Sequence, residues 1–246
     1  MADTTLTLGG VSLNLPGVYI YPYNDMRIPG RNVDMVSIPG RVGDVAADTG
    51  AFDNVLVDYT VVITDDLTDT LRALNTILFL QSDSGGYRTL TDSRFSDEYR
   101  MAVAKTSLTP HVSGELGKYR LTINCKPQRY LNSGNNPITY TATATLTADY
   151  RGRPIIKATA TNASAKMEFQ INDTKITVSP CGYSVVYFDC EARTAYNGTV
   201  SLTKYVLIQT GSNLNADYPE LLPGGNSIRL LTNCSQLQIT PRWWCV

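Results

Sequence analysis

Histidine and cysteine are scarce in this sequence, which has one histidine and five cysteines among its 246 residues. A catalytic or metal-binding histidine needs partner side chains. None stands at a recognisable spacing near His111, so we expect a residue of a loop or of the surface. The cysteines form no CxxC pair, and no histidine lies at zinc-ligand spacing from them. We therefore expect five free thiols, no metal site and no cofactor.

Long hydrophobic runs and an excess of charge of one sign are also missing. No stretch approaches the roughly 18 apolar residues that would cross a bilayer. The first ten residues, MADTTLTLGG, lack the basic and apolar regions of a signal peptide. The 21 lysine and arginine residues are balanced by 22 aspartate and glutamate residues, so no basic field attaches the chain to nucleic acid or anionic lipid. We expect a soluble, unsecreted protein with no membrane contact and no sequence-specific nucleic-acid binding.

Catalytic motifs are absent as well. The sequence contains no HExxH, no GxSxG, no P-loop and no GxGxxG. Two carboxylates that are distant in sequence can still meet in space, as in glycosidases, but no spacing singles out such a pair. We interpret Asp65 and Asp66 as the start of a helix. We expect no catalytic residue and no enzymatic activity.

The first half of the chain has the pattern of a β domain with one helix. Alternating residues over 1–23 predict short strands or an arm. IPGR recurs in RIPGRNVDMVSIPGRVGDV, where each Pro-Gly predicts a tight turn or loop. VLVDYTVVI predicts a strand, and three more strand-rich runs follow residue 86. Between them four leucines recur at helical spacing and predict a helix at about 66–81 whose apolar stripe lies on a sheet. These are Leu67, Leu71, Leu74 and Leu78.

The polar cluster NSGNNP, residues 132–137, predicts a domain boundary. We expect an N-terminal domain at 1–133 and a C-terminal domain at 134–246. Beyond the cluster, short strand patterns recur about every ten residues without a helical period. From Thr139 to Ala148 threonine alternates with apolar residues, which predicts a strand with one wet and one dry face. This half is therefore predicted to be a two-sheet β-sandwich or jelly roll.

Tyrosines of the second half leave a binding function open. Tyr183 and Tyr187 are four residues apart in CGYSVVYFDC, a spacing that puts both on one face of a strand. Exposed, coplanar rings there would suit a carbohydrate, whereas packing into the core is the commoner role of such a pair. Both interpretations remain at this stage.

The C-terminal segment QLQITPRWW holds both tryptophans of the chain. If it is a strand, Leu237, Ile239 and Trp243 share one face, while Arg242 and Trp244 share the other. We expect the first three residues in the core of the C-terminal domain. We expect Arg242 and Trp244 at an interdomain or intersubunit contact, because a large ring on a polar face needs a partner.

Several stretches taken in order resemble one family, the distal tail protein (Dit) of siphophages, which have long non-contractile tails. They are IPGRVGD, a short helix followed by GGYRTLTDSRFSDEYRMA, NCKPQRYL, YPELLPGGNSI and ITPRWW. The resemblance implies a mainly β fold. It has an N-terminal tail-tube-like β domain with one flanking α-helix, which forms a belt, followed by a C-terminal galectin-like β-sandwich.

The resemblance also implies a structural virion protein of the tail tip, assembled in the bacterial host cytoplasm. Members of this family form a homohexameric ring with a central channel for DNA. The ring joins the tail-tube protein to the tail hub or fibre (tail-associated lysin) protein, or to the baseplate. The C-terminal half has no loop long enough for an arm, so we expect no receptor-binding arm. The alternative function is a carbohydrate-binding tail protein that uses the C-terminal β-sandwich for host adsorption.

Overall fold

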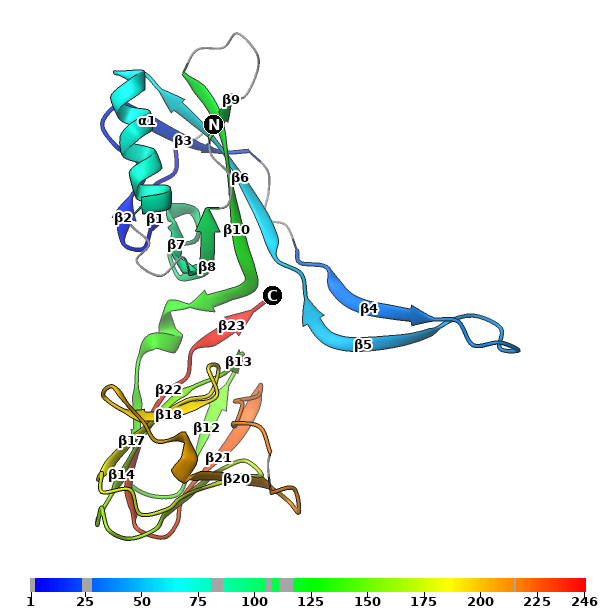
Figure 1. Cartoon of the computed structure of the whole chain (residues 1–246), viewed down its shortest axis with the longest axis vertical. Coiled ribbons are helices and arrows are strands. Elements are labelled where there is room, and N and C mark those ends of the chain that lie inside the picture. Colours follow the sequence, from blue (N-terminus) through cyan, green and yellow to red (C-terminus); the bar gives the residue numbers. More distant parts are fainter. Residues whose placement is uncertain (1–2, 24–27, 81–85, 105–107, 111–116, 215) are drawn as a thin grey trace. The chain divides into compact units, whose positions relative to one another are not determined.

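The computed structural model describes every residue except 1–2, 24–27, 81–85, 105–107, 111–116 and 215. His111 lies outside the described residues. The chain is mainly β and divides into two compact units (Figure 1). The first unit is Met1–Arg129 together with Val246, and the second is Tyr130–Cys245. In the described ranges, no helix has both the length and the apolar character needed to cross a membrane.

The first unit is built from antiparallel strands, and the strands predicted in this half are confirmed. They are β1 (Leu6–Leu8), β2 (Val11–Ser12), β3 (Val18–Pro22), β6 (Val55–Ile63), β7 (Arg88–Asp92), β8 (Glu98–Ala104), β9 (Thr109–Pro110) and β10 (Lys118–Leu131). Neighbouring strands run β2-β1-β7-β8-β10, while β6 pairs with both β3 and β10. In β6 every second side chain, including Val57 and Tyr59, is buried in one hydrophobic core. Period-two burial of β-branched and aromatic residues is what a half-buried strand requires.

The predicted helix is present as α1 (Leu67–Asn75), which continues as a π-helical turn, η1 (Thr76–Leu80). Asp66 caps it, because its carboxylate accepts hydrogen bonds from two backbone N–H groups of the first turn at 3.0 and 3.2 Å. Of the predicted stripe, two leucines are buried in the core and two pack against it: Leu74 and Leu78, then Leu67 and Leu71. The predicted end at residue 81 lies outside the described residues.

The second unit contains two antiparallel sheets around one core, as the strand spacing predicted. One sheet has the order β11 (Ile138–Tyr140), β22 (Cys234–Thr240), β14 (Ile155–Ala160), β17 (Val185–Asp189), β18 (Thr194–Asn197) and β19 (Val200–Ser201). The other has the order β12 (Ala144–Ala148), β21 (Gly224–Leu230), β15 (Met167–Ile171), β16 (Thr174–Val178) and β20 (Val206–Thr210). Phe169 of one sheet and Phe188 of the other meet edge to face, with ring centroids 5.4 Å apart. Strands β13 (Arg151–Gly152) and β23 (Trp243–Cys245) form a further pair.

The segment from Thr139 to Ala148 is not one strand, and that prediction was wrong. It forms parts of β11 and β12, which pair with β22 and β21 in different sheets. The residues between them leave strand geometry, so the chain changes sheets here. Its alternation persists because both sheets face the same core: Leu146 is buried while Thr145 and Thr147 are exposed.

Glu168 is a buried acid of this sandwich that is held by two lysines. Its carboxylate lies 3.0 Å from the ammonium groups of Lys175 and Lys166 and accepts a hydrogen bond from Thr232 at 2.9 Å. The hydrogen bonds from Lys175 and Lys166 lower the pKa of Glu168 to about 2. The ionised form is therefore favoured by the folded state.

Acid should destabilise the second unit through this group. Because folding lowers the pKa, the stability contributed by the Glu168 carboxylate is present above its ordinary pKa of 4.5 and is lost as the pH falls toward 2. Urea unfolding, followed by the fluorescence of the two tryptophans, should show a falling midpoint across this window. Glu168→Gln should be less stable at pH 7 but should lose less stability between pH 5 and 3. Equal losses in both proteins would contradict the assignment.

Candidate functional site

A hairpin of the first unit forms a separate two-stranded sheet (Figure 1). It consists of β4 (Arg31–Val36) and β5 (Val45–Phe52), and the N–H of Asp53 donates to the carbonyl of Gly30 at its base, at 2.9 Å. The IPGR repeat brackets β4. Its second copy makes the predicted turn, in which the N–H of Arg41 donates to the carbonyl of Ile38 at 3.1 Å. The two strands themselves were not predicted, because VAADTGAF in β5 carries little β-forming signal.

The apolar side chains of this hairpin are exposed. Val42 is fully exposed, Ile28 just before the hairpin is 87% exposed, and Met35 is 62% exposed. No residue of β4 or β5 is buried. A two-stranded ribbon is marginally stable alone in water, and clustered exposed apolar residues mark a surface for protein contact. The hairpin is therefore the first candidate assembly surface.

The C-terminal segment is the second candidate surface. Leu237 and Ile239 on β22 are fully buried in the core of the second unit, and Trp243 on β23 is partly buried and packs against that core. The alternation breaks between the two strands, where Arg242 adopts a positive φ of 53°. Trp244 is partly exposed, and its backbone pairs with Arg151.

Arg242 is anchored inside the second unit by its guanidinium group. Its Nη2 lies 2.7 Å from Oδ1 of Asp189, and its Nε donates to the carbonyl of Arg153 at 2.7 Å. Burial lowers the pKa of Arg242, but Asp189 and Glu191 outweigh it and the net pKa is raised. These contacts explain how an arginine holds a left-handed backbone conformation. An interdomain or intersubunit contact of Arg242 and Trp244 stays a prediction.

Two glycines make room for the strand that carries Trp243. A Cβ at Gly134 would overlap the backbone nitrogen of Trp243. A Cβ at Gly152 would overlap the carbonyl oxygen of Pro241 and lie 3.0 Å from the Trp243 ring. The indole thus packs directly on the backbone of Gly152, and close approach, not turn formation, requires glycine at both positions.

Gly134→Ala and Gly152→Ala should each destabilise the second unit by about 1–3 kcal/mol, because the added methyl group meets backbone that has no room to move. Gly225→Ala is the matched control, since its Cβ would meet only the Thr145 methyl group, at 3.3 Å. Urea unfolding at pH 7 measures the three effects. A control that loses as much stability as the other two would refute the packing argument.

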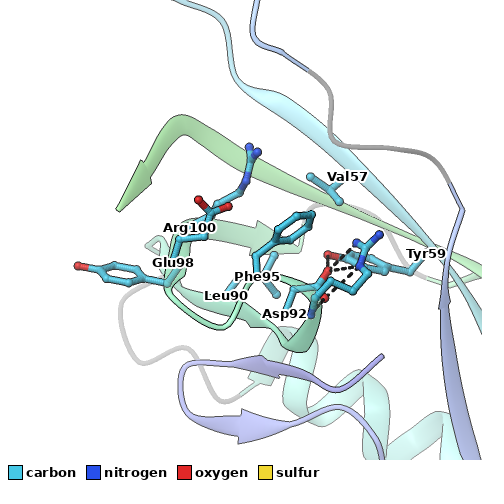
Figure 2. A pocket seen from close by; sticks show the side chains of 9 residues that line it. Val57, Tyr59, Leu90, Asp92, Phe95, Glu98 and Arg100 are labelled. Carbon is cyan, nitrogen blue, oxygen red and sulfur yellow. Dashed lines mark hydrogen bonds and ion pairs between the residues drawn. The ribbon is translucent and has the colours of Figure 1, made fainter. Parts of the chain in front are cut away.

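The stretch TDSRFSDEYR folds as the end of β7, a 3-10 turn η2 (Ser93–Phe95) and the start of β8. Asp92 organises the turn: its carboxylate accepts hydrogen bonds from Tyr59 at 3.0 Å and Arg94 at 2.6 Å (Figure 2). It also accepts a hydrogen bond from Thr4 at 2.7 Å. Burial raises the pKa of Asp92, but the bonds from Arg94 and Thr4 outweigh it and the net pKa is lowered. The carboxylate of Asp92 is therefore hydrogen-bonded to the N-terminal segment, to β6 and to the turn η2.

No group of three or more His, Cys, Asp or Glu residues could hold a metal ion among the described residues. All five cysteines are free, as predicted. Burial raises the pKa of Cys125 to about 12 and that of Cys234 to about 11, so neither thiol is an activated nucleophile.

The two tyrosines considered for carbohydrate binding are not on one strand face, and that prediction was wrong. Tyr183 precedes β17, directly after Gly182 with φ of 79°, and packs against the core. Tyr187 lies on β17 and stacks on Tyr196, with ring centroids 5.6 Å apart. Because β17 begins only at Val185, Tyr183 does not share the strand of Tyr187, which removes a two-ring platform made from this pair.

No protein-family profile matches this sequence, and no curated protein sequence resembles it significantly. Solved structures do resemble the fold. One is the Dit protein of phage SPP1, described as a paradigm of the hub adsorption apparatus in phages that infect Gram-positive bacteria. It has a TM-score of 0.65 and 16% sequence identity, with 97% of this chain and 98% of that chain covered.

The baseplate of phage p2 in its activated conformation is also similar. The calcium-bound structure gives a TM-score of 0.58 at 10% identity and covers 97% of this chain and 98% of that chain. The strontium-bound structure gives 0.57 at 10% identity and covers 96% and 97%. At such identities the likeness concerns the fold, so this chain has a Dit-like fold over nearly all of its length.

Proposed function

We propose that this protein is a structural component of the virion, forming a homohexameric ring at the distal end of a non-contractile phage tail. The observation that carries this proposal is the likeness to SPP1 Dit over 97% of the chain. The ring joins the tail-tube protein to the tail hub or fibre protein, or to the baseplate, and leaves a channel for DNA. The role is structural and requires no catalysis.

The exposed hairpin supports a repeated interface between copies. A closed ring uses one heterologous contact, in which a surface of each copy meets a different surface of the next. The β4–β5 hairpin offers apolar side chains such as Met35 and Val42, together with unpaired strand edges. Both would be covered in a ring, which removes the aggregation hazard of an exposed edge. We therefore assign the hairpin to the contact between subunits.

Charge balance supports the passage of DNA through such a ring. The chain carries 21 basic and 22 acidic residues. A protein without a basic excess releases few counterions on contact with phosphates and so holds DNA weakly. We propose a minimal ring component that has no receptor-binding arm of its own.

Negative-stain electron microscopy and mass photometry of the purified chain test the ring. We expect class averages with six-fold symmetry and a central hole, and a particle mass that corresponds to six chains. The ring should form either from the chain alone or after a tail-tube protein is added. A chain that associates neither with itself nor with a tail-tube protein would refute the proposal.

A further inference from the structure

Arg100 is a charged residue at an inward-facing position of the first unit. It lies on β8, where the next inward residues are Ala102 and Ala104, and only 8% of it is exposed. Its Nη1 is buried and has no hydrogen-bond partner among the described residues. Burial lowers the pKa of Arg100, yet a guanidinium keeps its charge at neutral pH. A buried N–H group of a cation that lacks an acceptor is unfavourable.

The neighbouring acids already have cations of their own. Asp92 is paired with Arg94 at 2.6 Å. Glu98 is paired with Arg129 at 3.2 Å. Glu98 also attracts Arg100, but Arg129 repels it, so the acid is shared between two arginines. The site therefore favours an anion.

Arg100 lines a small cavity together with apolar side chains, two tyrosines and the paired ions Asp92, Arg94 and Glu98 (Figure 2). The cavity measures about 30 Å³ and is bordered by Val57, Leu90 and Phe95. A buried water occupies about 10–15 Å³ on this measure, so there is room for two or three non-hydrogen atoms. A carboxylate group fits this space, whereas a sugar ring or a nucleotide does not.

We propose that this cavity binds a carboxylate group whose oxygens accept hydrogen bonds from Arg100. The planar guanidinium matches a carboxylate in shape and charge, and the space holds the carboxylate group while the rest of the acid lies outside it. The carboxylate comes either from a free organic acid or from an acidic side chain of a second copy of this chain. Both sources use the same chemistry, and neither depends on the ring proposed above.

Acetate is the probe for a direct test. The measurement follows the Nε–Hε resonance of Arg100 in ¹⁵N-labelled protein at pH 7, and the resonance is assigned by its loss in Arg100→Met. As acetate replaces chloride at constant ionic strength, this resonance should shift and then reach a plateau. The resonance of Arg72 is the internal control, because the Arg72 side chain is 77% exposed. Its shift should not reach a plateau at acetate concentrations below about 0.2 M, where salt screening weakens contacts between surface charges. A response of Arg100 that is linear and equal to that of Arg72 would overturn the proposal.

Thermal melting separates ligand binding from a purely structural role. Acetate should raise the melting temperature of the wild type and leave that of Arg100→Met unchanged, with Arg72→Met responding like the wild type. Equal responses of the wild type and Arg100→Met would count against the site. Mass photometry then identifies where the carboxylate comes from. If it belongs to a second copy of the chain, acetate and Arg100→Met should both reduce self-association. If it belongs to a free organic acid, neither should change self-association.

Discussion

Removal of the β4–β5 hairpin should leave a folded protein that no longer forms rings. Residues 31–52 can be replaced by a Gly-Ser dipeptide, because the backbones of Gly30 and Asp53 already meet at 2.9 Å. No residue of the two strands is buried, so the core of the first unit keeps all its side chains. We expect a circular dichroism spectrum that is still that of a folded β protein, and a sixfold drop in particle mass by mass photometry.

Point variants make the same test without deleting backbone. Met35→Asp combined with Val42→Asp should weaken association at least tenfold, because each change replaces an exposed apolar contact with a charge that must lose its water. Asp44→Asn on the same hairpin is the matched control, since it changes an exposed polar residue and leaves the apolar surface intact. If the chain without residues 31–52 still forms particles with as many copies as the wild type, the assignment of the hairpin to the subunit contact is wrong.

Trp243→Ala should destabilise the second unit by roughly 2–4 kcal/mol, close to the range for large-to-small core substitutions. The indole packs against the core and onto Gly152, so its loss removes contacts with both. Trp244→Ala should cost less than about 1 kcal/mol in the isolated chain, as surface changes do. Urea unfolding followed by circular dichroism at pH 7 measures both.

The two tryptophans also differ in what their loss should do to assembly. If Trp244 makes an interdomain or intersubunit contact, Trp244→Ala should weaken ring formation while the second unit keeps its stability. Trp244→Phe is the conservative control and should retain most of the association. Equal losses of unfolding free energy from Trp243→Ala and Trp244→Ala would contradict the division between core and contact.

Local patterns predicted most of the elements because their signals come from neighbouring residues. The leucines at helical spacing and the capping Asp66 specify α1 within one short segment. Alternation in VLVDYTVVI specifies β6 in the same way. Each signal depends on one face being apolar, and the structure buries that face.

The errors arose where distant residues decide the outcome. The segment 139–148 alternates throughout, yet it divides between two sheets because both sheets share one core. The strands β4 and β5 form without a buried face, so the hydrophobic pattern could not predict them. Tyr183 lies before the first residue of β17, so the alternation that holds for Tyr187 does not extend to it.

The sequence by itself determined a mainly β chain with one helix, two halves, free thiols and a resemblance to phage tail-tip proteins. These follow from periodicity, composition and motif order, which are local or one-dimensional. Only the tertiary structure decided that Arg100 lies at an inward position with its nearby acids already paired. It also decided that Trp243 lies against Gly152. Such facts depend on which segments meet in space: Glu98 and its partner Arg129, for example, are 31 residues apart along the chain.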